Sequence, residues 1–184
     1  MTIATSRQLF LLAAVICFSG CSFFQRPPPL PRHAAVERSV SEEEFVGLVQ
    51  DADIIYFPSE AATVTSRSEP AWKLLGALRG GGSSSFAIGS DWTANEHARR
   101  EYLNEASRAG AQVLSLNDAD QFAADRIAGY FREHRGDKVL VFIRRERLGL
   151  GRGVPYLVAQ QTKARQLILN PTKSSTRARL LAGD

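Results

Sequence analysis

The chain has 184 residues, and its 23 lysines and arginines outnumber its 19 acidic residues, which gives a formal net charge of +4. This length fits one domain with an ordinary hydrophobic core rather than two. The modest positive charge comes with no recognisable nucleic-acid-binding module, so the sequence predicts no nucleic-acid partner.

The N-terminus has the order of an export signal. Arg7 precedes an apolar run from Leu9 to Phe18 that is too short to span a bilayer, and two small residues then precede Cys21. The Phe-Ser-Gly-Cys sequence that ends at Cys21 resembles the lipobox of bacterial lipoproteins. The resemblance implies cleavage before Cys21, lipidation of its thiol and new amino group, and a membrane anchor in the cell envelope. Because Ser22 is not the aspartate that commonly retains such lipoproteins at an inner membrane, an outer membrane is favoured where the cell has one. A plain secretory signal peptide is the alternative.

Removal of residues 1–20 also decides the cysteine chemistry. Cys17 lies in the removed segment and Cys21 would carry lipid, so the mature chain has no thiol for a disulfide or a metal site. Residues 21–40 are rich in proline and charge without apolar periodicity, which predicts an extended tether between the lipid and the domain.

From residue 41 the chain alternates helical and strand patterns. Ser41 and Glu44 form a capping box for a first helix, and apolar runs predict strands at 53–57, 85–88, 111–116, 139–143 and 166–169 with helices between them. Thr93 is predicted to cap the third helix, and Asn117 or Asp118 the fourth. This alternation predicts an α/β fold with a mostly parallel central sheet of about five strands and helices on both faces. The domain is expected to span 41–170, followed by a frayed basic tail at 171–184.

The stretch from Lys138 to Pro155 is the strongest candidate for a ligand site. The apolar run from Val139 to Ile143 is typical of a strand buried on both faces, and it ends abruptly in arginines. Three glycines at alternate positions then allow tight turns before a short helix. Because open α/β sheets bind ligands beyond the carboxyl ends of their strands, these arginines and backbone amides predict an anion site. The alternative is that the arginines are solvated and pair with Glu146. The predicted ligand-binding residues are Tyr56, Glu60, Arg144, Arg145, Arg147, Gly149, Gly151, Arg152 and Gly153.

Four stretches resemble the ChaN-like haem-binding uptake domains of the Tiki superfamily. They read D-A-D-I-I-Y-F-P-S-E, A-G-A-Q-V-L-S-L-N, D-R-I-A-G-Y-F-R-E-H-R-G-D-K-V-L-V-F-I and G-R-G-V-P-Y-L, and together they cover most of residues 41–170. The resemblance implies an α/β domain that binds haem for iron uptake. Haem needs a cationic grip for its propionates and an axial ligand, for which Tyr56 is the candidate.

The family's site motifs are only partly present. The glycine-glutamate-x-histidine motif that usually ends the first strand reads Ser59, Glu60, Ala61, Ala62 here, and arginines stand where a glycine and a histidine usually follow the late strand. Glu60 alone cannot hold a metal, so we expect no metal site and no metal-dependent hydrolysis of the kind the Tiki branch performs. The alternative to a haem carrier is a scaffold or interaction module that has kept the fold and lost the site.

Overall fold

The computed structural model of the protein describes residues 37–62, 70–80, 86–90, 96–149, 151–172 and 175–181. The predicted export signal, Cys21, nearly all of the tether and the predicted cap Thr93 lie outside the described residues. In the part that is described, every helix is too short or too polar to cross a membrane.

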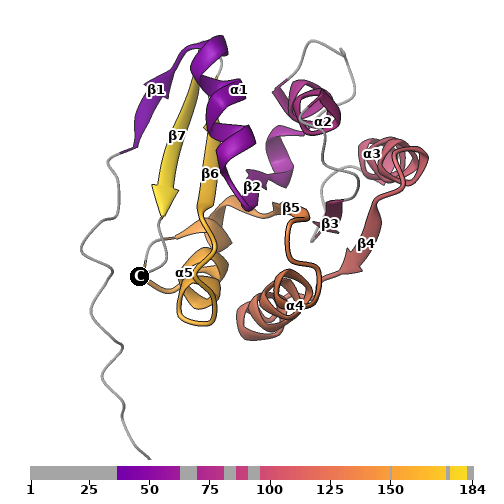
Figure 1. Ribbon diagram of the computed structural model, residues 1–184, viewed down its shortest axis with the longest axis vertical. Helices are drawn as coiled ribbons and strands as arrows, with labels where there is room; N and C mark the ends of the chain where they lie inside the picture. The colour runs from indigo at the N-terminus through magenta and orange to yellow at the C-terminus, as the bar shows by residue number, and fades with distance from the viewer. Residues whose placement is uncertain are drawn as a thin grey trace, which may run out of the picture.

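Seven strands of the described chain form one mixed sheet in the order β1-β7-β6-β2-β5-β3-β4 (Figure 1). The strands are β1 (Arg38–Val40), β2 (Ile54–Pro58), β3 (Phe86–Ser90), β4 (Gln112–Ser115), β5 (Lys138–Ile143), β6 (Gln166–Pro171) and β7 (Thr176–Leu181). Strands β2 to β6 pair with one another in parallel, whereas β7 runs antiparallel to β6 and β1 antiparallel to β7. The protein therefore has an α/β fold, and the prediction of a mostly parallel sheet of about five strands is corrected to a mixed sheet of seven.

The two antiparallel strands come from segments that the sequence analysis assigned to the tether and the tail. In β7, Ala178 and Leu181 are buried among other apolar side chains, while Arg177 is exposed. A strand with charged residues on one side lacks the continuous apolar run that marked β5, which is why the pattern was missed. Among the described residues, the folded unit thus runs from β1 to β7 instead of from 41 to 170.

The helices are α1 (Glu42–Asp51), α2 (Pro70–Gly80), α3 (Glu96–Arg108), α4 (Asp120–Glu133) and α5 (Val154–Ala159), with short 3-10 turns η2 (Ser59–Ala61) and η3 (Arg145–Leu148). α1 begins as predicted, since the Glu44 N–H donates to the Ser41 hydroxyl at 3.2 Å. α4 does not, because its N-cap is Ala119, and Asn117 instead accepts a hydrogen bond from the Ala119 N–H at 3.0 Å.

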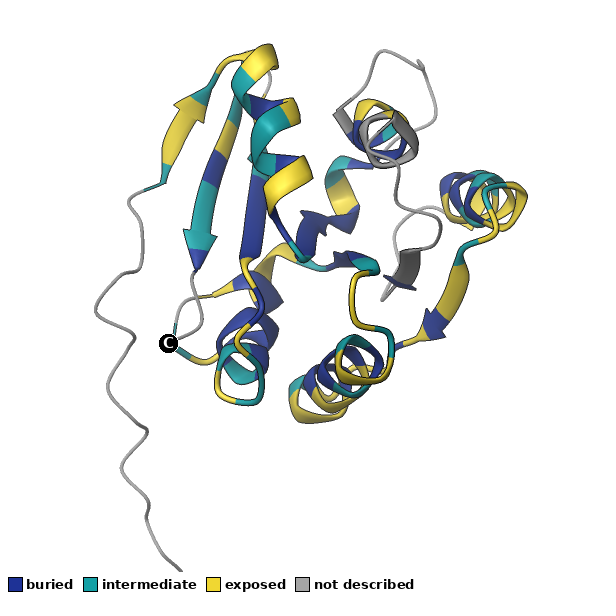
Figure 2. Ribbon diagram, in the orientation of Figure 1, coloured by how far each residue is buried: buried dark blue, intermediate teal, exposed yellow. Residues whose placement is uncertain are grey.

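Apolar side chains form two clusters. Ile55 and Phe57 of β2 pack with residues of α1, α2 and α3, whereas Ile54 and Tyr56 pack with residues of α4 and α5. Neighbouring residues of β2 enter different clusters because side chains alternate along a strand. The run from Val139 to Ile143 is fully buried and lies between β2 and β3, which confirms the prediction of a central strand there. Figure 2 shows buried residues following β6, β2 and β5 through the middle of the molecule.

Candidate ligand-binding site

The carboxyl ends of β2 and β5 meet near the middle of the sheet. The strands are parallel neighbours, with Pro58 opposite Ile143. The chain leaves β2 toward α2, whose side chains belong to one cluster, and leaves β5 toward α5, whose side chains belong to the other. Such a divergence of connections marks the crevice where open α/β sheets bind ligands. Glu60 and Arg145 come together here, because the Arg145 backbone N–H donates to both Glu60 carboxylate oxygens at 3.2 Å.

Tyr56 lies in the core and does not face a ligand. Its side chain is fully buried, and its hydroxyl donates to Oε1 of Gln166 at 2.8 Å. Burial raises the pKa of the Tyr56 hydroxyl well above its ordinary value, which disfavours the phenolate that would ligate haem iron. The structure therefore favours the core role for Tyr56 over the predicted axial ligand.

Arg147 is a buried structural residue. Its side chain is 4% exposed, its Nε donates to Oδ1 of Asp120 at 2.5 Å, and its Nη1 donates to the Asn117 carbonyl oxygen at 2.9 Å. These bonds join η3 to the segment that begins α4. The guanidinium of Arg147 is thus used inside the protein, in place of the predicted contact with a ligand.

The neighbouring arginines and the glycine loop differ in their surroundings. Arg144 is half-buried and forms ion pairs with Asp118 at 3.7 Å and Glu146 at 3.2 Å, as the alternative interpretation of a solvated loop expects, and Arg152 is exposed. Gly151 has a φ of 89°, a left-handed conformation that favours glycine. The Gly153 N–H donates to the Gly149 carbonyl oxygen at 3.0 Å, so this amide closes the loop on itself and does not point to a ligand.

Arg145, in contrast, lines a pocket of about 140 Å³. We call this pocket the edge pocket, and its residues are Glu37, Arg145, Leu148, Gly149, Ile168, Asn170 and Arg179. Arg145 is the second residue after β5, and Asn170 is near the end of β6, so the pocket lies at the carboxyl edge of the parallel strands. This is the edge where the sequence predicted a ligand.

A chain of hydrogen bonds forms the polar side of the edge pocket. The Arg145 guanidinium donates to Oδ1 of Asn170 at 2.5 Å, and Nδ2 of Asn170 donates to Oε1 of Glu37 at 3.0 Å. The Arg179 guanidinium donates to Oε2 of Glu37 at 3.1 Å. Two guanidinium groups against one carboxylate give the pocket a formal charge of +1. Leu148 and Ile168 supply its apolar side.

Glu37, Asn170 and Arg179 were not among the predicted site residues. Glu37 was placed in the tether and Arg179 in the tail, and Asn170 closes the expected domain. The signal that could have found Arg179 is the order Arg177, Ala178, Arg179, Leu180, in which charged and apolar residues alternate as in a half-buried strand.

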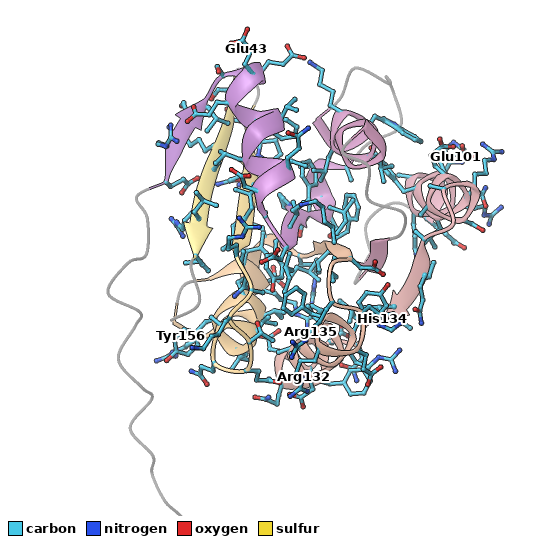
Figure 3. All side chains as sticks on the ribbon, in the orientation of Figure 1. Glu43, Glu101, Arg132, His134, Arg135 and Tyr156 are labelled. Carbon is cyan, nitrogen blue, oxygen red and sulfur yellow. The ribbon has the colours of Figure 1, made fainter. Side chains whose placement is uncertain are left out.

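A second pocket, of about 250 Å³, lies between β4 and α4 and includes Gln112, Tyr130 and His134. The His134 ring stacks on Tyr130 with centroids 4.1 Å apart, and its Nδ1 lies 3.1 Å from the Tyr130 carbonyl oxygen, so the residue is half-buried at the end of α4 (Figure 3). Among the residues the structure describes, no group of three or more His, Cys, Asp or Glu side chains could hold a metal ion.

Comparisons of the chain with family models, with curated proteins and with solved structures find no match. The fold and the edge pocket define an α/β domain with a mixed sheet and a small, positively charged pocket at its carboxyl edge. The resemblance to ChaN-like domains stays a prediction.

Proposed function

We propose that the mature protein is a lipid-anchored protein of the bacterial cell envelope whose α/β domain binds a small anionic ligand in the edge pocket. The observation that carries the proposal is the placement of Arg145 and Arg179 around one pocket beyond β5 and β6. Ligands of open α/β sheets bind at this edge, and arginine suits anions because its donors form a planar fork. We also infer that the helices of the two clusters cover opposite faces of the sheet, which the alternation of Ile54 and Ile55 supports.

The volume of the edge pocket limits the size of the ligand that it can hold. Its volume of about 140 Å³ is close to that of an engineered cavity of about 150 Å³ in another protein that takes up benzene. Pockets for drug-sized ligands measure about 300 to 1,000 Å³. A porphyrin is several times larger than benzene, so haem could place no more than a propionate group inside. We therefore favour a small anion over haem as the ligand. A role in iron uptake depends on haem binding and is not part of this proposal.

The lipid anchor is tested by mass spectrometry of protein purified from its native membrane. We expect a chain that starts at Cys21 and carries lipid on the thiol and the amino group. A chain that retains Met1, or an unmodified Cys21, would contradict the anchor.

The ligand site is tested by calorimetric titration of the full-length chain in detergent with succinate, butyrate, phosphate and haem. Arg145→Gln should weaken binding of the anion by about tenfold, because a hydrogen bond to a charged group contributes about 1.5 to 3 kcal/mol and the exposure of Arg145 favours the lower end of this range. Arg99→Gln is the matched control, since Arg99 is exposed on α3. Absence of saturable heat with every anion, or equal binding by the two variants, would sink the proposal.

The alternative function is a scaffold or interaction module without a ligand. The burial of Tyr56 and Arg147, two predicted ligand contacts that the fold uses internally, favours it. We do not propose a metal-dependent hydrolase. Metal analysis and a peptide-cleavage assay test this choice. Stoichiometric zinc or manganese, with cleavage that a chelator abolishes, would contradict it.

A further inference from the structure

The edge pocket already holds a carboxylate that belongs to the chain itself. One Glu37 oxygen accepts from Nδ2 of Asn170 at 3.0 Å, and the other accepts from the Arg179 guanidinium at 3.1 Å. We infer that the ligand of this pocket is a small carboxylate that replaces Glu37 as the hydrogen-bond acceptor of Asn170 and Arg179. This replacement releases β1 from the sheet. The inference rests on the proposal that the pocket binds a small anion.

The strand register explains why Glu37 reaches the pocket. Arg38 pairs with Ala178 across the antiparallel β1 and β7, so Glu37 comes opposite Arg179 one step further along. Arg179 in turn pairs with Ile168, whose side chain forms part of the apolar wall. Glu37 and Arg179 are therefore a cross-strand pair of opposite charge on the pocket side of the sheet. The carboxylate is in the pocket because β1 is docked.

The contacts of Glu37 indicate the chemical class of the ligand. Each of its two oxygens takes a different donor, which is an arrangement that an external carboxylate can reproduce atom for atom. Leu148 and Ile168 beside these donors suit a short hydrocarbon body. With Glu37 displaced, Arg145 and Arg179 leave a charge of +2 in the pocket, which favours a short dicarboxylate such as succinate.

The docking of β1 is weak enough for a ligand to compete with it. The strand has three residues, lies at the end of the sheet and pairs with β7 alone, and Arg38 and Ser39 are exposed. The Glu37 and Arg179 side chains are 26% and 23% exposed, so their ion pair is worth about 1 kcal/mol. Short, exposed elements open at small free-energy cost. Because β1 is the last part of the predicted tether, residues 21–40, its release would lengthen the link between the domain and Cys21.

The exchange is tested by calorimetric titration of the full-length chain in detergent with succinate, with butyrate and phosphate as comparison anions. Glu37→Gln removes the competing charge and should bind succinate about three- to tenfold more tightly, since about 1 kcal/mol of competition is lost. Arg179→Gln should bind it about tenfold more weakly. Glu43→Gln is the matched control, because Glu43 is exposed on α1 and points away from the sheet in Figure 3; it should bind as the parent does.

The outcomes separate this inference from the proposed function. If the parent binds succinate and Arg179→Gln weakens binding but Glu37→Gln does not strengthen it, the exchange is overturned while the anion site stands. Binding of phosphate without either carboxylate overturns the ligand class. If no anion binds the parent or Glu37→Gln, the proposed function fails and the inference fails with it.

A second measurement does not depend on any variant. Hydrogen exchange of the parent with saturating succinate should become faster at the β1 amides, Arg38 to Val40, while the β6 amides, Gln166 to Asn170, stay protected. Slower exchange in β1 would mean that the ligand tightens the strand, which overturns the release.

Discussion

Replacement of Arg147 by methionine tests whether this arginine supports the fold or a ligand. Methionine keeps the apolar stem in place and removes the guanidinium, and with it the hydrogen bonds to Asp120 at 2.5 Å and to the Asn117 carbonyl at 2.9 Å. Removing one partner of a buried ion pair costs about 3 to 5 kcal/mol. The Asp120 side chain is 36% exposed, so water can hydrate the carboxylate left behind. We therefore expect a loss of about 2 to 3 kcal/mol in the free energy of unfolding.

The assay is urea denaturation of the full-length chain in detergent, followed by far-ultraviolet circular dichroism. Asp120→Asn should cost less than Arg147→Met, because the amide oxygen of asparagine can still accept from the guanidinium. The double variant with both Arg147→Met and Asp120→Asn should lose less free energy of unfolding than the two single variants lose together. The difference should be about 0.5 to 3 kcal/mol, as expected for residues in contact. The matched control is Arg99→Met, an exposed arginine of α3, which should change stability by less than about 0.5 kcal/mol.

The reasoning is refuted if Arg147→Met unfolds at the same urea concentration as Arg99→Met. A stable Arg147→Met variant that loses anion binding would restore the original prediction that Arg147 grips a ligand. A destabilised variant that still binds anions would show that the anion does not need Arg147, as a site at Arg145 and Arg179 requires.

Three further predictions follow from packing and ionisation. Val141→Asp buries an unpaired charge in the central strand, so urea denaturation should show a loss of several kcal/mol; near-parent stability would mean that β5 is exposed. Gly153→Ala should destabilise, because a Cβ there would contact the Gly149 carbonyl oxygen at 2.7 Å, whereas Gly129→Ala in α4 meets nothing within 4 Å and should stabilise by about 0.5 to 1 kcal/mol in the same assay. Burial and a hydrogen bond to Asp137 raise the pKa of Tyr130 to about 12, so Asp137→Asn should lower the alkaline transition in tyrosine absorbance. Because the pKa of Tyr130 is higher in the folded than in the unfolded protein, its protonated hydroxyl stabilises the folded state below pH 10, and this contribution is lost as the pH rises from 10 to 12. An absorbance transition that Asp137→Asn leaves unchanged would contradict the Asp137 contact.

The centre of the fold could be predicted because its strands are buried on both sides. Val139 to Ile143 and Ile54 to Phe57 are continuous apolar runs, and in a sheet only a strand covered on both faces needs such a run. The Ser41 cap was predictable for a different reason, since it depends on atoms three residues apart. Local chemistry and complete burial are the two signals that do not require knowledge of the tertiary structure.

The edge of the sheet could not be predicted in the same way. β1 and β7 each alternate charged and small or apolar residues over a few positions, and short alternating runs are also found in loops. Their pairing depends on the β6 edge, which a sequence pattern does not show. Phe122 illustrates the same limit on α4, where it is an apolar residue of the same helix as the fully buried Ile127 and yet is 43% exposed. The helical period places a residue on a face, whereas the neighbouring elements decide how far that face is covered.

Arg145 and Arg147 show why the site was predicted only in part. Both follow the central strand, both are charged, and a sequence gives no reason to separate them. The structure places them in the 3-10 turn η3, where the side chains of residues two apart point about 120° apart around the axis. Arg147 consequently turns inward to Asp120, and Arg145 turns toward Asn170 and the edge pocket. The composition of this loop predicts a positively charged edge, but the turn that the loop adopts decides which guanidinium stabilises the protein and which can meet a ligand.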